Sequence, residues 1–179
     1  MKSIAIFCGS TLGSDAIFAE TAHQTGQLIA EQGKTLVYGG GRSGLMGIVA
    51  DSALNAGGQV IGVIPQGLVD RELAHPHLTE LHIVKNMHER KTMMADLSDG
   101  FIALPGGAGT IEEIFEQWTW AQLGIHLKPC AFLTMWNVRH GKDGIDYLDM
   151  CLVQRSSDFA TAGCINQVQY LVFLHLVAR

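Results

Sequence analysis

One glycine-rich turn, at residues 105–109, limits what this chain can fold into more than any other segment. The turn reads PGGAG, follows the apolar run Phe101–Leu104 and precedes a helical pattern that begins near Thr110. Glycines let a backbone come close to a ligand, and the free N–H groups at a helix start attract anions such as phosphate. Glu112 and Glu113 follow in the first helical turn, where carboxylates repel a phosphate. Chemistry on a sugar explains these carboxylates better than phosphate binding alone.

The same order of strand, turn and helix runs through most of the chain. Apolar runs predict strands, and the helical periodicity between them predicts helices. This alternation is typical of an α/β, Rossmann-like fold, a doubly wound parallel sheet with helices on both faces, here as one domain over residues 1–179. The expected strands are Lys2–Cys8, Thr35–Tyr38, Gln59–Ile64, Glu80–Val84, Phe101–Leu104 and Cys130–Thr134, and the expected helices are Asp15–Gln32, a helix from Gly44 through Ala56, Met87–Leu97 and Thr110–Leu123.

Outside these elements the pattern is weaker. Gln66–Thr79 is expected to be a loop, Ile145–Val153 a helix, and Gln169–Val177 a strand or a buried helix. Ligands of doubly wound sheets bind beyond the carboxyl ends of the strands. The three glycine-bearing turns, at residues 9–11, 39–44 and 105–109, all fall at such ends, so we expect them to share one crevice.

Charge and composition exclude several classes of function. The 179-residue chain has a formal net charge of −5, which argues against a nucleic-acid backbone as its main partner. No apolar run approaches the roughly 18–20 residues that span a bilayer, and the opening residues read as a strand rather than a signal peptide. A soluble, cytoplasmic protein is therefore expected. The four cysteines form no CxxC pair and the eight histidines no metal-ligand set, so no metal site is expected.

The turn after the second strand has more than one interpretation. Gly39, Gly41 and Gly44 match the spacing of the dinucleotide fingerprint GxGxxG, but the third strand ends without the acidic residue that holds a ribose. A phosphate-binding turn is therefore favoured over an NAD site, with tight turn packing as the alternative. The P-loop pattern GxxxxGK[ST] is absent from the sequence.

Two charged pairs carry the candidate chemistry, and each also has an ordinary structural explanation. Arg90 and Lys91 suit a solvated helix face, yet the strand after their helix ends at the PGG turn, so Arg90 can reach the same crevice. A guanidinium fork suits phosphate or a polarised ribose or base. Glu112 and Glu113 gain about 0.3–1 kcal/mol each from the helix dipole without any catalytic role.

Together these motifs closely resemble the LONELY GUY family, the cytokinin riboside 5′-monophosphate phosphoribohydrolases. The family hallmarks P-G-G-x-G-T-x-x-E and M-H-x-R-K are matched at residues 105–113 and 87–91. The segments at 8–10, 38–41, 44–47 and 120–124 are also similar to the family. The resemblance covers residues 1–134, whereas the tail at 135–179 diverges.

The resemblance implies a homodimeric hydrolase that releases free base and ribose 5-phosphate from a purine nucleoside 5′-monophosphate, of cytokinin type or AMP. No metal or organic cofactor is implied. Arg90 and Glu113 are the implied catalytic pair, and glycoside cleavage passes through an oxocarbenium-like state that a carboxylate stabilises. The implied substrate-binding residues are Gly9, Ser10, Gly40, Gly41, Met46, Glu72, Lys91, Gly106, Gly107, Gly109, Thr110, Glu112 and Thr119.

Two other functions would use the same residues. One is a nucleosidase for a common nucleotide such as AMP, and the other is a non-catalytic carrier of a phosphorylated ligand, as in molybdenum-cofactor carriers. Glu113 beside Arg90 favours the enzyme, because a pure anion carrier gains little from a carboxylate. Apolar side chains on the helices Met87–Leu97 and Thr110–Leu123 further indicate a dimer interface. They are Met93, Met94, Ile114, Phe115, Trp118 and Leu123.

Overall fold

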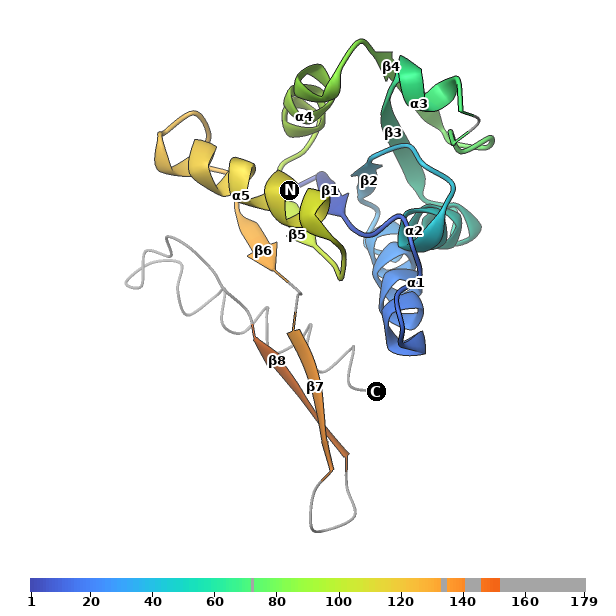
Figure 1. The fold of residues 1–179 in the computed structure, drawn as a ribbon, viewed down its shortest axis with the longest axis vertical. Helices are drawn as coiled ribbons and strands as arrows, with labels where there is room; N and C mark the ends of the chain where they lie inside the picture. The colour runs from blue at the N-terminus through green and yellow to red at the C-terminus, as the bar shows by residue number, and fades with distance from the viewer. Residues whose placement is uncertain (72, 133–134, 141–145, 152–179) are drawn as a thin grey trace.

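The computed structural model describes residues 1–71, 73–132, 135–140 and 146–151 (Figure 1). Its main body alternates strands and helices in the order that the sequence predicts. The strands are β1 (Ser3–Phe7), β2 (Thr35–Tyr38), β3 (Gln59–Pro65), β4 (Glu80–Val84), β5 (Phe101–Ala103), β6 (Cys130–Phe132), β7 (Met135–His140) and β8 (Asp146–Cys151). The helices are α1 (Ala16–Glu31), α2 (Gly44–Asn55), α3 (Gln66–Val69), α4 (Met87–Asp96) and α5 (Ala108–Gln122).

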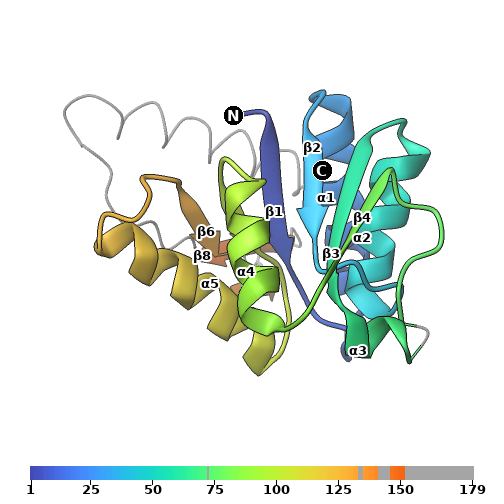
Figure 2. The same cartoon turned by 90° about the horizontal axis from the view of Figure 1, so that it is seen from above.

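Six parallel strands form one sheet in the order β4-β3-β2-β1-β5-β6. Near its centre, Ala5 of β1 is opposite both Val37 of β2 and Phe101 of β5. The chain runs outward from β1 to β4 and then returns across the sheet to β5, so right-handed crossovers place its helices on two faces. Figure 2 shows α1 and α2 on one side of the sheet and α4 and α5 on the other. The predicted doubly wound parallel sheet is confirmed.

Both faces of the sheet are apolar because helices cover both. Side chains alternate along β1, so that Ile4 and Ile6 join the core beneath α1 and α2, while Ala5 and Phe7 join the core beneath α4 and α5. Phe7 stacks on Phe101 of the neighbouring strand, with ring centroids 6.1 Å apart. These strands therefore read as continuous apolar runs, which is why the sequence predicts them well.

The segment Gln66–Thr79 is mostly a loop, but it begins with the one-turn helix α3. The expected strand Cys130–Thr134 is described as β6 as far as Phe132, and residues 133–134 lie outside the described part. Among the described residues, no helix is long and apolar enough to span a bilayer.

The prediction of a helix at Ile145–Val153 is wrong. Asp146–Cys151 forms β8, which pairs antiparallel with β7 from Met135↔Cys151 to His140↔Asp146. So short a segment is a marginal helix without packing, whereas pairing with β7 satisfies its backbone groups. The segment Gln169–Val177 lies outside the described residues.

Candidate active site

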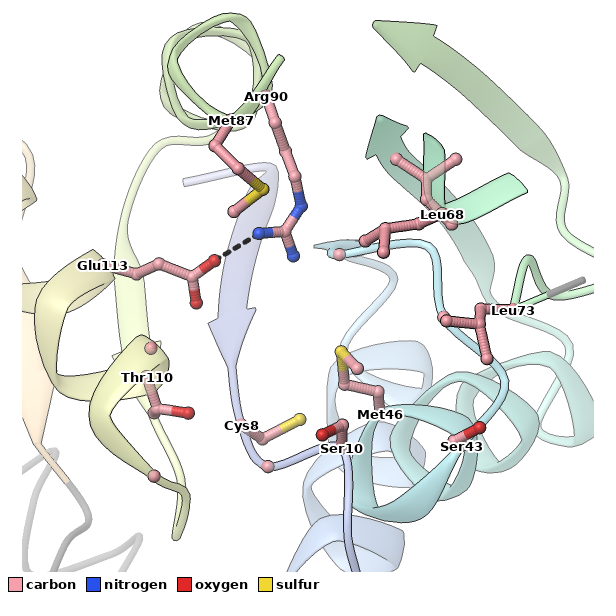
Figure 3. A pocket seen from close by; sticks show the side chains of 16 residues that line it. Cys8, Ser10, Ser43, Met46, Leu68, Leu73, Met87, Arg90, Thr110 and Glu113 are labelled. Atoms are coloured by element: carbon pink, nitrogen blue, oxygen red, sulfur yellow. Dashed lines mark hydrogen bonds and ion pairs between the residues drawn. The ribbon is translucent and has the colours of Figure 1, made fainter. Parts of the chain in front are cut away.

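The three glycine turns meet at the carboxyl ends of the central strands and enclose a cavity of about 520 Å³ (Figure 3). The expectation that they share one crevice is confirmed. The lining residues come from β3, α2, α3, α4 and α5, from the turns that follow β1, β2 and β5, and from the loop that follows α3. They are Cys8, Gly9, Ser10, Gly39, Gly41, Ser43, Met46, Ile64, Leu68, Leu73, Met87, Arg90, Gly107, Gly109, Thr110 and Glu113.

Backbone hydrogen bonds hold the turns together. The N–H of Gly9 donates to the Pro105 carbonyl over 3.0 Å, and the N–H of Met46 donates to the Gly9 carbonyl over 3.3 Å. Gly44, at the start of α2, has a φ of 60° and lies so close to Ser10 that a Cβ there would overlap the Ser10 carbonyl group. Only glycine combines that backbone conformation with that approach.

One end of the cavity is the start of α5. Gly107 is the N-cap of this 15-residue helix and makes no side-chain cap, so the N–H groups of the first turn are left for water or a ligand. Gly107, Gly109 and Thr110 line the cavity, and the Thr110 side chain lies on its wall in Figure 3. The helix dipole adds partial positive charge. The arrangement suits a phosphate group.

A buried ion pair lies in the middle of the cavity wall. Arg90 Nη1 of α4 donates to Glu113 Oε1 of α5 over 2.5 Å, and each side chain is 9% exposed (Figure 3). Arg90 Nε also donates to the Val63 carbonyl over 3.0 Å, which fixes the plane of the guanidinium. Burial raises the pKa of the Glu113 carboxyl above its ordinary value, and the Arg90 charge offsets part of that effect. The pair places a carboxylate and a fork of donors where a ligand can reach both.

The other end of the cavity is apolar. Figure 3 shows Leu68 and Leu73 on the side opposite Glu113 and Thr110, and Ile64 and Met46 also line the cavity. From one end to the other, the cavity therefore offers an anion cradle, an ion pair and an apolar wall. A ligand that suits it has an anionic end, a polar middle and a flat or apolar far end.

The resemblance implies that Lys91 and Glu112 contact the substrate; in the structure their side chains pair with each other. Lys91 Nζ lies 2.6 Å from Glu112 Oε1 and 3.0 Å from Glu116 Oε2. Neither residue is among the described residues that line the cavity. Thr119 is exposed, and its hydroxyl donates to the Phe115 carbonyl within α5. Substrate contacts by these three residues stay predictions.

The structure brings most of the other candidate residues together. Gly40 lies behind the cavity wall, against Ile64 and Leu81, and Gly106 lines a neighbouring cavity of about 450 Å³. Glu72 lies outside the described residues. Those that line the main cavity are Gly9, Ser10, Gly41, Met46, Arg90, Gly107, Gly109, Thr110 and Glu113.

Sequence reasoning missed Leu68, which lies in α3, and Leu73, which lies in the loop that follows α3. Their position depends on distant contacts: the N–H of Arg42 donates to the Leu73 carbonyl over 3.0 Å, and buried His75 lies 3.0 Å from Asp51 of α2. The leucines of the segment Gln66–Thr79 were the available signal.

Cys8 was also missed as a lining residue, although it is the last apolar residue before the first glycine turn. Burial, together with the nearby Glu113 charge, raises the pKa of its thiol far above the ordinary value. The thiol therefore stays protonated and is not a nucleophile. In the described part of the chain, no three His, Cys, Asp or Glu side chains are grouped as a metal site requires.

Known proteins share both the sequence and the fold. The family model described as "Possible lysine decarboxylase" matches residues 46–152, more than half of the chain. The cytokinin riboside 5′-monophosphate phosphoribohydrolase of Rhodococcoides fascians is 52% identical over 133 residues, 74% of this chain and 67% of that protein. The cytokinin riboside 5′-monophosphate phosphoribohydrolase LOG1 of Arabidopsis thaliana is 47% identical over 134 residues, 75% of this chain and 63% of that protein. The chain thus spans about two thirds of the length of these curated relatives.

Solved structures with a similar fold include molybdenum-cofactor proteins. The molybdenum cofactor binding protein of Rippkaea orientalis is 25% identical, with a TM-score of 0.61 over 74% of this chain and 76% of that one. The molybdenum cofactor carrier protein of Chlamydomonas reinhardtii is 23% identical, with a TM-score of 0.58 over 73% and 74% of the two chains, and shows the fold alone. The sequence identity to the phosphoribohydrolases is about twice as high. The chain therefore belongs to the LONELY GUY family.

Proposed function

We propose that this chain hydrolyses the N-glycosidic bond of a purine nucleoside 5′-monophosphate of the cytokinin type and releases the free base and ribose 5-phosphate. The observation that carries the proposal is the buried Arg90–Glu113 pair, which lies between an anion cradle and an apolar wall. The relatives are named as cytokinin riboside 5′-monophosphate phosphoribohydrolases, which supports the same conclusion.

The order of groups along the cavity matches the order in the substrate. The 5′-phosphate would occupy the N-terminus of α5, where Gly107, Gly109 and Thr110 meet. The ribose would then lie beside Glu113, and the base with its N6 substituent would lie toward Leu68 and Leu73. The cavity volume of about 520 Å³ is of the size that small-molecule sites have.

The proposed roles follow from charge. As the bond between C1′ and the base nitrogen breaks, positive charge develops on the ribose, and the Glu113 carboxylate stabilises it. The same carboxylate would orient a water whose oxygen bonds to C1′. One proton of that water finally resides on the departing base. Arg90 holds the carboxylate in place and presents donors to the substrate.

Glu113→Gln tests this proposal. The substitution keeps the shape of the side chain but removes its charge, so base release should fall by about 100-fold or more. The assay incubates wild-type and variant protein with AMP and with N6-isopentenyl-AMP and measures free base by chromatography. A variant that keeps more than a tenth of the wild-type rate contradicts the assigned role of Glu113.

The same assay separates the alternatives. A nucleosidase for common nucleotides would release adenine from AMP as fast as it releases the modified base. A carrier would bind nucleotide without releasing any base. The observation that supports this alternative is the similar fold of the molybdenum-cofactor binding protein. Fold similarity alone does not decide function, so base release by the wild type is the decisive measurement.

We further propose that the chain is a single domain that works as a homodimer in the cytoplasm. Met94 and Ile114, expected at the interface, are instead fully buried in the core. Ile111, Phe115 and Leu123 of the α5 region remain between 47% and 71% exposed, and an apolar surface of this kind is typical of an interface. Light scattering should give twice 19.4 kDa, and a monomer with full activity would contradict the dimer. Cys8 and Cys130 are free thiols, as in a reducing compartment.

A further inference from the structure

A second ion cluster joins α4 to α5 beside the cavity. Lys91 Nζ bonds to Glu112 Oε1 at 2.6 Å and lies 3.0 Å from Glu116 Oε2. The Lys91 side chain is only 7% exposed, although it is the most flexible type of charged side chain. Burial by itself lowers the pKa of the Lys91 ammonium, but the bonds to Glu112 and Glu116 raise it above the ordinary value, so the group stays charged. The cluster therefore surrounds a buried cation, although the Glu112 side chain is 56% exposed and that of Glu116 is 23% exposed.

The cluster and the cavity pair are neighbours in both helices. Arg90 and Lys91 are consecutive on α4, and Glu112 and Glu113 are consecutive on α5. Within the described part of the chain, the recorded side-chain hydrogen bonds and ion pairs between α4 and α5 all involve Arg90 or Lys91. A change in the spacing of the two helices at Lys91 would therefore also displace the Arg90–Glu113 pair.

A direct contact between Lys91 and the substrate phosphate fits the geometry poorly. The cradle for an anion is made by Gly107, Gly109 and Thr110, and Lys91 is not among the described residues that line that cavity. To reach a phosphate, the ammonium would have to leave two carboxylates, and Glu112 and Glu116 would lose their cation. Leaving charges unpaired at a partly buried site is costly.

We infer that Lys91 is a positioning residue, which acts through Glu112 and Glu116 to hold α4 and α5 at the spacing that the Arg90–Glu113 pair needs for catalysis. The inference rests on the proposed hydrolysis. Without Lys91, the carboxylates Glu112, Glu113 and Glu116 would face a single cation, Arg90. All three carboxylates lie on α5, so the loss of Lys91 would remove two ionic contacts between the helices, and Glu112 and Glu116 would compete with Glu113 for Arg90 where the reacting groups must be placed most accurately.

The test is the steady-state kinetics of Lys91→Met with the nucleotide that the wild type hydrolyses. We expect kcat to fall by roughly 10- to 100-fold, because misplacement of reacting groups by about 1 Å has effects of that size. KM should stay within about threefold of the wild-type value, because the phosphate cradle is unchanged. Lys91→Arg, which keeps a cation for both carboxylates, should restore most of kcat.

Two further variants remove partners of Lys91 rather than the lysine itself. Glu116→Gln should lower kcat in the same direction as Lys91→Met, and Lys91→Met added to a Glu112→Gln/Glu116→Gln background should lower it little further. These variants also serve if Lys91→Met does not fold. Lys128→Met is the matched control, because Lys128 Nζ donates to the Ala95 carbonyl near the end of α4 over 2.6 Å, away from the cavity. This control should keep the wild-type kcat.

The outcomes are distinct. A raised KM with an unchanged kcat in Lys91→Met would show that Lys91 binds the phosphate, and would overturn the inference while leaving the proposed function intact. Unchanged kcat and KM, with only a lower melting temperature, would show that the cluster contributes to stability alone. That result would also overturn the inference. If the wild type releases no base, the proposed function fails and this inference fails with it.

Discussion

Gly39→Ala should damage the site while leaving the fold in place. Gly39 follows β2 and lies directly against the Arg90 side chain. A Cβ at this position would overlap Arg90 Nη2 and would come within 3.4 Å of Met46 Sδ. Gly39 is not among the glycines with a positive φ, so alanine can adopt the native backbone conformation. The substitution therefore acts on Arg90 rather than on the turn.

The size of the effect follows from how Arg90 is held. Its guanidinium bonds to Glu113 over 2.5 Å and to the Val63 carbonyl over 3.0 Å, so it cannot move without losing one of them. Relief of the overlap requires a shift of about 1 Å, which costs roughly 100-fold in rate, or about 2.7 kcal/mol of activation free energy. The free energy of unfolding should change by about 1 kcal/mol or less, because alanine restricts the unfolded chain and offsets part of the strain.

The assay compares kcat/KM for base release and the melting temperature of wild type, Gly39→Ala and a control. Gly67→Ala is the matched control, because no atom lies within 4 Å of a Cβ at Gly67 and this residue of α3 does not line the cavity. The control should keep the wild-type rate. If Gly39→Ala keeps a rate within threefold of the wild type, Arg90 is not needed in the position that the structure gives it, and the proposed site is wrong.

Two further predictions concern pH and the phosphate. Because burial raises the pKa of Glu113 above 4.5, its carboxylate should be lost at a higher pH than usual as the solution is acidified, and the acidic limb of kcat/KM should lie above pH 4.5. Glu112→Gln should move this limb to lower pH, because the Glu112 charge helps to raise the Glu113 pKa. Wild type and variant are measured with the same substrate, so that titration of the substrate's phosphate affects both pH profiles equally. Adenosine should be hydrolysed roughly 100-fold more slowly than AMP, because the phosphate is a principal anchor, and equal rates would remove the α5 N-terminus from the mechanism.

The parts of the fold that the sequence predicts well are those that local pattern decides. Thr35–Tyr38 and Glu80–Val84 are strands with the expected bounds, and β5 ends one residue earlier than expected, at Ala103. The central strands are mostly apolar because helices cover both faces of the sheet, and glycine-rich turns follow β1, β2 and β5. The β8 strand was not predictable in this way, because it depends on pairing with β7.

The glycines and charged residues of the candidate site were predictable, but its apolar wall and the partners of the charged residues were not. Arg90 and Lys91 differ by one position, a rotation of about 100° around the helix axis, and that rotation sends one side chain to the cavity and the other to Glu112 and Glu116. Whether a residue faces the neighbouring helix or the ligand depends on the way that α4 packs on the sheet, which no local pattern states. The same rotation separates Glu113 from Glu112.

The Arg90–Glu113 pair also explains why this site suits an enzyme better than a carrier. A buried ion pair contributes little to stability, since the cost of removing both charges from water offsets their attraction. A carrier of anions would do better with Arg90 alone, because Glu113 repels the ligand that the α5 N-terminus attracts. A glycosidase needs a negative charge next to the phosphate site, because positive charge develops on the sugar as the bond breaks. Anion cradle, carboxylate and apolar wall follow one another in this cavity as phosphate, ribose and base do in a nucleoside monophosphate. The Glu113 carboxylate, which would weaken anion binding by a carrier, is therefore the group that the reaction requires.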